Sequence, residues 1–163
     1  MTAETRPDGA AARVTLAGGR LVDPGNGIDA VVDVHLEGGV VAAVGTPPPG
    51  FSPDAVHRVA GRIVCPGLVE LRAALREPGG EHKATIASET RAAARGGVTT
   101  VCCTPDTSPV VDTPAVVELI HQRAQEAGHA RVEVLGAMTR GLEGTHLAEM
   151  GALRDAGCIG VCN

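Results

Sequence analysis

Short apolar runs separated by turn residues fill the chain from Arg13 to about Ala60. The runs RVTL, RLV, AVVDVHL and VVAAV are followed in turn by Gly18-Gly19, DPGNG, EGG and the proline-rich GTPPPGFSPD. The third run alternates apolar and polar positions, which is the period of a strand with one buried and one solvated face. The pattern predicts a small β-sheet layer with His35 on its solvated side.

After Gly61 the pattern changes to strands alternating with helices. RIVCPGLVEL is an apolar, β-branched run, EHKATIASETRAAARGG is rich in helix formers, and VTTVCCTP again resembles a strand. The next helix is predicted to begin with Thr113 as N-cap and Pro114 at the first helical position, and to end at Gly128. One face of this helix is apolar and is expected to be buried: Val116, Val117, Ile120, Ala124 and Ala127.

RVEVLGAM is then a strand, THLAEMGALRDAG a helix with Leu147, Met150 and Leu153 facing inward, and CIGVCN a fourth strand. Such alternation implies right-handed crossovers and a parallel sheet. Four strands and three helices make about half of an eight-stranded barrel, which takes roughly 250 residues. The predicted fold is therefore α/β, with a leader and small β-sheet layer over residues 1–61 and a partial (β/α) barrel over residues 62–163. An open edge at the fourth strand favours a homo-oligomer.

Composition narrows the function classes. Apolar residues make up 44% of the chain, Phe51 is the single aromatic residue, and the formal net charge is −5. Neither nucleic acid nor an anionic membrane is an expected partner, because there is no basic surface and no aromatic stacking platform. The N-terminus has no apolar export segment, so we expect a cytoplasmic protein. There the cysteines stay reduced, and we interpret them as small buried residues: Cys65, Cys102, Cys103, Cys158 and Cys162.

Three segments carry a family resemblance: REPGGEHKATI, TRAAARGGVTTVCCTPDTSPVVDTPAVVE and VLGAMTRGLEGTHLAEMGALRDAG. In this order they resemble the N-terminal part of a dihydroorotase of the amidohydrolase superfamily, over about residues 14–163. The resemblance implies a composite β-layer followed by a (β/α)8 barrel. It also implies one or two zinc ions at the C-terminal mouth of the barrel, where they activate a water that attacks the ring amide of dihydroorotate.

The chain departs from the family at the metal ligands. The family's first barrel strand ends Asp-x-His-x-His, and the matching positions here are Glu70, Arg72 and Ala74. Alanine has no lone pair to donate, and arginine places a permanent positive charge where a cation would lie. At the end of the fourth strand, Asn163 falls at or next to the carboxylate that bridges the metals in the family. We therefore expect no catalytic residue and no cofactor, although the active family uses zinc.

Two further positions match the family's substrate contacts. Arg76 lies where the family has a substrate-binding arginine, and it is either a surviving anion contact or a structural arginine held by Glu77 or a loop carbonyl. Asp106 replaces an asparagine that binds the substrate carboxylate, and its charge would repel an anion. Arg72 and Arg76 together form a weaker candidate for a dicarboxylate or carbamoyl phosphate site, which Asp106 opposes.

The leading hypothesis is a non-catalytic dihydroorotase-like protein of pyrimidine biosynthesis. The resemblance also implies a partner, since some bacteria carry an inactive dihydroorotase homologue that assembles with aspartate carbamoyltransferase. One alternative is a cyclic amide hydrolase with a non-standard metal site, which would recruit Cys65, Cys103, Cys162 or ligands from another chain. Another alternative is a truncated remnant of such an enzyme.

Overall fold

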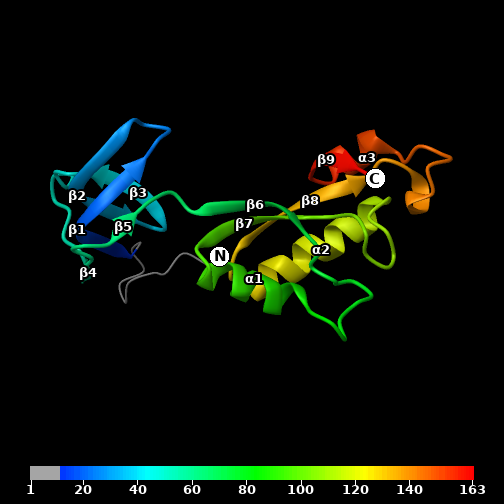
Figure 1. The fold of residues 1–163 in the computed structure, drawn as a ribbon, viewed down its shortest axis with the longest axis horizontal. Helices are drawn as coiled ribbons and strands as arrows, with labels where there is room; N and C mark the ends of the chain where they lie inside the picture. The colour runs from blue at the N-terminus through cyan, green and yellow to red at the C-terminus, as the bar shows by residue number, and fades with distance from the viewer. Residues whose placement is uncertain (1–11) are drawn as a thin grey trace. The chain divides into compact units, whose positions relative to one another are not determined.

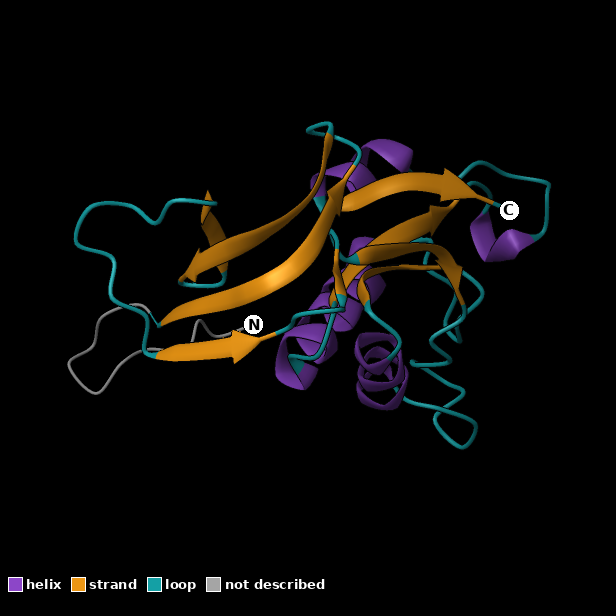
Figure 2. Ribbon diagram, turned by 60° about the vertical axis from the view of Figure 1, so that its left-hand side comes forward, coloured by secondary structure: helices purple, strands orange, loops and turns teal. Residues whose placement is uncertain are grey.

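The computed structural model describes residues 12–163, which divide along the chain into two units, residues 12–66 and residues 67–163. Residues 12–66 contain strands and loops only, and every helix of the described chain lies in residues 67–163 (Figures 1 and 2). None of these helices combines the length and apolar character needed to cross a bilayer. The leader expected before Ala12 lies outside the described residues.

The first unit is one sheet of five strands: β1 (Arg13–Asp23), β2 (Ile28–Glu37), β3 (Val40–Val44), β4 (Ala55–Arg58) and β5 (Ile63–Val64). The strand order is β3-β2-β1-β4, and β5 also pairs with β1. β2 runs antiparallel to β1, whereas β4 and β5 run parallel to it. The predicted β-layer is therefore present, with β4 as a strand that the sequence pattern did not indicate.

The expected turn at Gly18-Gly19 is wrong, because β1 continues through it as a single strand. The pairing with β2 shifts register between Leu16 and Gly19, and Gly18 has a left-handed φ of 74°. The Gly18 N–H donates to the Asp33 carboxylate on β2 at 2.8 Å. This side-chain acceptor replaces the lost ladder bond, so the strand bends without ending.

The expected solvent exposure of His35 is also wrong, since the side chain is buried. Its Nε2 donates to the Gly45 carbonyl at 2.9 Å, and its Nδ1 bonds to the Thr15 hydroxyl at 2.9 Å. Phe51 covers the ring edge-on, with 5.2 Å between ring centroids. Both nitrogens have partners, which is what allows a polar residue of the strand to be buried.

The second unit begins the barrel. The elements of this unit are β6 (Leu68–Ala73), α1 (Ile86–Arg95), β7 (Val98–Cys103), α2 (Pro114–Ala127), β8 (Arg131–Ala137), the 3-10 helix η1 (Arg140–Leu142), α3 (Met150–Asp155) and β9 (Cys158–Cys162). The four strands form a parallel sheet in the order β6-β7-β8-β9. The predicted parallel α/β fold is confirmed. Apolar residues of β7 and β8 pack with α1, α2 and α3 into one core.

The run RIVCPGLVEL forms two strands rather than one. Ile63 and Val64 pair with β1 in the first sheet, and β6 starts only at Leu68. Residues 62–66, which the sequence pattern places with the barrel, therefore lie in the β-sheet unit. Pro66, between the two strands, has no N–H to donate to a ladder.

The prediction for helix α2 is confirmed. Pro114 is its first residue, Gly128 ends it with a left-handed φ of 65°, and four residues of the expected apolar face are buried. Helix α3 differs from expectation, because it starts at Met150 and only Leu153 faces the core. Leu147 and Met150 are 62% and 38% exposed, respectively. Leu147 precedes the helix and pairs with Thr139 in a bridge that closes the loop after β8.

Candidate functional site

The candidate site lies where the four parallel strands of the barrel unit end. Because the strands are parallel, the residues that follow them gather at one end of the sheet. These are the loops 74–85, 104–113 and 138–149, together with Asn163. The positions that the resemblance matches to the family's metal ligands and substrate contacts fall on this end or on β6 just before it.

Glu70, Arg72 and Ala74, which the resemblance matches to the family's first metal ligands, bring no group of metal-binding side chains together in the described chain. Glu70 and Arg72 are exposed on β6, and Ala74 follows the strand. One Glu70 oxygen, Oε1, accepts the backbone N–H of Arg72 at 3.0 Å. Only Glu70 of the three has a metal-ligating atom. Nowhere in residues 12–163 do three or more His, Cys, Asp or Glu side chains gather as a metal-holding group. The donor set that these three positions supply, a single carboxylate, does not fit zinc.

Asn163 is bound by Thr139 instead. Its Oδ1 accepts from the Thr139 backbone N–H at 3.1 Å and from the Thr139 hydroxyl at 2.9 Å. The same hydroxyl oxygen accepts the Gly144 N–H at 3.0 Å. Thr139 thereby connects the end of β9 to the loop after β8, and the Asn163 amide oxygen is already engaged.

Asp106 and Arg76 lie on neighbouring loops, and both side chains are exposed. The Thr104 hydroxyl donates to Asp106 at 2.5 Å, and the Thr104 backbone N–H donates to the Ala73 carbonyl at 3.1 Å. Arg76 has a left-handed φ of 67°, and its carbonyl accepts the Gly80 N–H at 2.6 Å. Within the described chain the Arg76 guanidinium has no acidic partner.

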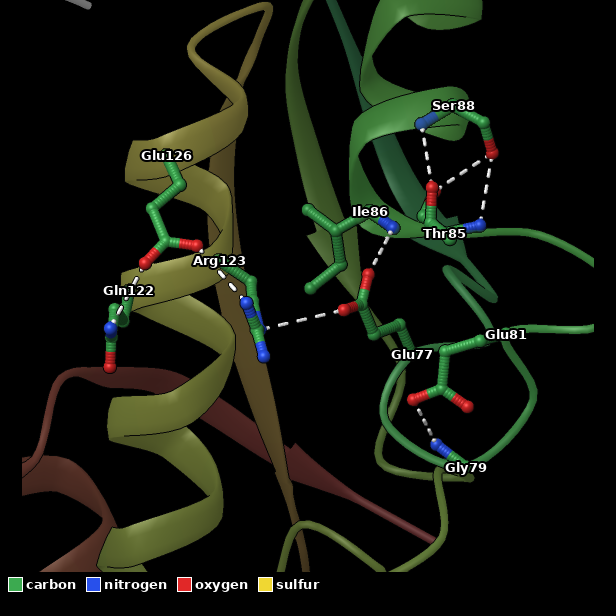
Figure 3. Close-up of polar contacts among 9 residues, drawn as sticks. All are labelled: Glu77, Gly79, Glu81, Thr85, Ile86, Ser88, Gln122, Arg123 and Glu126. Carbon is green, nitrogen blue, oxygen red and sulfur yellow. Dashed lines mark hydrogen bonds and ion pairs between the residues drawn. The ribbon is translucent and has the colours of Figure 1, made fainter.

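The sequence leaves two interpretations of Arg76 open, an anion contact or a structural arginine held by Glu77 or a loop carbonyl. The Glu77 carboxylate does not hold it. Its Oε2 accepts the backbone N–H of Ile86 at 2.8 Å, and its Oε1 lies 3.6 Å from Nε of Arg123 on α2 (Figure 3). A carboxylate at the start of α1 also interacts favourably with the helix dipole. The sequence contains no signal for this contact, because its partners lie 9 and 46 residues further along the chain.

The start of α1 is fixed by two more contacts shown in Figure 3. Thr85 and Ser88 form a reciprocal capping box, with bonds of 3.0 and 3.1 Å between each hydroxyl and the other residue's N–H. Within the loop, the Gly79 N–H donates to Glu81 at 2.8 Å. This backbone hydrogen bond holds the pKa of the Glu81 carboxyl below its usual value. The loop that carries Arg76 is thus held by several of its own polar groups.

The cysteines proposed as substitute ligands lie in different environments. Cys103 is fully buried, and burial, with a smaller contribution from the Asp106 charge, raises the pKa of its thiol to about 12. Cys65 is exposed in the β-sheet unit, and Cys162 is half-buried on β9. Burial also raises the thiol pKa of Cys102 and Cys158. The expectation of small buried residues is confirmed for Cys102, Cys103 and Cys158, and is wrong for Cys65.

The Cys103 thiol predicts a loss of stability in alkali. An unfolded thiol ionises near 9.0 and the folded one near 12, so between these values the unfolded state has released a proton that the folded state still binds. We expect the free energy of unfolding to fall with rising pH, with this thiol contributing up to about 1.4 kcal/mol per pH unit. Urea unfolding at a series of pH values measures the slope. Cys103→Ala should reduce it, Cys65→Ala should not, and equal slopes would contradict the assignment.

Comparisons with known proteins identify first the fold of this chain and then its family. The solved structure of L-hydantoinase (dihydropyrimidinase) from Arthrobacter aurescens matches with a TM-score of 0.74 and 23% identity, over 91% of this chain and 32% of that one. The crystal structure of a dihydroorotase matches with a TM-score of 0.61 and 16% identity, over 92% of this chain and 42% of that one. The fold is that of the N-terminal part of these two proteins.

Sequence relatives give the family. The dihydroorotase-like protein of Pseudomonas putida is 51% identical over 150 residues, and the dihydroorotase of Syntrophotalea carbinolica is 44% identical over 149 residues. These matches cover 92% and 91% of this chain, and 35% of each relative, so the chain spans about a third of their length. The family described as dihydro-orotase-like matches residues 61–163, and the chain belongs to it.

Proposed function

We propose that the protein is a non-catalytic member of the dihydro-orotase-like family, acting in pyrimidine biosynthesis. The observation that carries this proposal is the side-chain chemistry at the barrel mouth. Arg72 and Ala74 occupy ligand positions on and after β6, and the Asn163 amide oxygen is bound to Thr139. The relative from Pseudomonas putida, at 51% identity, is itself called dihydroorotase-like.

Zinc content tests the catalytic part of the proposal. Protein expressed with added zinc and then dialysed extensively is expected to retain almost none by elemental mass spectrometry, because the donor set at the mouth does not fit the ion. An active dihydroorotase treated in parallel shows whether dialysis itself strips bound zinc. Retention of about one or two zinc ions per chain, as in the catalytic sites of such enzymes, would overturn the proposal.

The proposed role is that of a structural partner of aspartate carbamoyltransferase. Its support is the family resemblance together with a mouth whose ligand positions do not fit catalysis. Co-expression with the aspartate carbamoyltransferase of the same genome is expected to give a complex that co-elutes at micromolar concentration and raises the stability of the transferase. Separate elution of two intact, folded proteins would refute the partnership.

A cyclic amide hydrolase with a non-standard metal site is the second candidate. It is favoured by the 44% identity to a protein called dihydroorotase. It is opposed by the burial of Cys103, whose thiol stays protonated at neutral pH. Ring opening of dihydroorotate that depends on zinc and is abolished by Cys162→Ser or Cys65→Ser would decide in its favour.

A further inference from the structure

We draw no further inference here: the strongest candidate, the loop 74–85 that carries the Arg76 guanidinium at the carboxyl end of the barrel sheet, belongs to the site already described and restates the substrate contact that the family resemblance implies.

Discussion

Gly79→Ala is expected to lower the free energy of unfolding of the barrel unit by about 3 kcal/mol. A Cβ at this position would lie 2.2 Å from the Ser108 carbonyl oxygen and 2.6 Å from the Ser108 Cβ, so the two loops would have to separate. Gly79 also has a left-handed φ of 91°, which alanine adopts at a cost of about 1–2 kcal/mol. The steric overlap adds to that strain.

Gly97→Ala is the matched control for this prediction. Gly97 has a similar φ of 84° in the same unit, but no neighbouring atom lies within 4 Å of its Cβ position. Gly97→Ala should therefore lower the free energy of unfolding only by the backbone strain of about 1–2 kcal/mol. Denaturant unfolding followed by the helical circular dichroism signal measures both variants, since the helices of the described chain all lie in this unit. Equal losses would show that the contact with Ser108 contributes nothing.

Leu153→Ala is expected to lower the free energy of unfolding by about 3 kcal/mol, within the range found for leucines removed from cores. The Leu153 side chain is fully buried and belongs to the main core cluster. It also packs beside Gly136, where an added Cβ would lie 2.9 Å from the Leu153 Cδ1. This close packing leaves little freedom to collapse around a cavity.

Leu147→Ala makes the same chemical change six residues earlier in the chain. Because this leucine is mostly exposed, its loss should change the free energy of unfolding by about 0.5 kcal/mol or less. The same denaturant titration serves both variants. A large loss for Leu147→Ala would support the interpretation of residues 145–157 as one helix with Leu147 inward, which the structure contradicts.

The elements predicted correctly are those defined by local signals. Helix α2 has a proline at its start, a left-handed glycine after its end and an apolar face between them, and each of these acts within a few residues. The alternation of strands and helices likewise sets the parallel order of the barrel sheet without any long-range information.

The errors arise where a distant residue changes the outcome. β1 passes Gly18 as a strand because Asp33 on β2 accepts its N–H, and His35 is buried because Gly45 and Thr15 satisfy its ring. Leu147 is excluded from α3 because Thr139 pairs with it. In each case a contact with a distant residue decides the local structure. The pattern of apolar and polar positions in the segment does not indicate that contact.

The candidate site likewise has features that the sequence alone indicates and features that it does not. The identities of Arg72 and Ala74 are informative without a structure, because neither side chain has an atom that can bind zinc in any conformation. Asn163 differs from them, since its side chain has an amide oxygen. The partners of these residues could not be predicted. Thr139 reaches Asn163, and Glu77 reaches Arg123, only after segments 24 and 46 residues apart have been brought together.

The Glu77 carboxylate joins its own loop to the backbone at the start of α1 and to the Arg123 side chain on α2. These contacts form together only when both helices are in place, so the loop opens as part of a larger cooperative unit and not as an independent surface segment. The amide hydrogens of Gly80 and Ile86 should then exchange with solvent at a common, slow rate. Arg76, whose carbonyl accepts the Gly80 N–H, keeps one backbone conformation for as long as that unit stays closed.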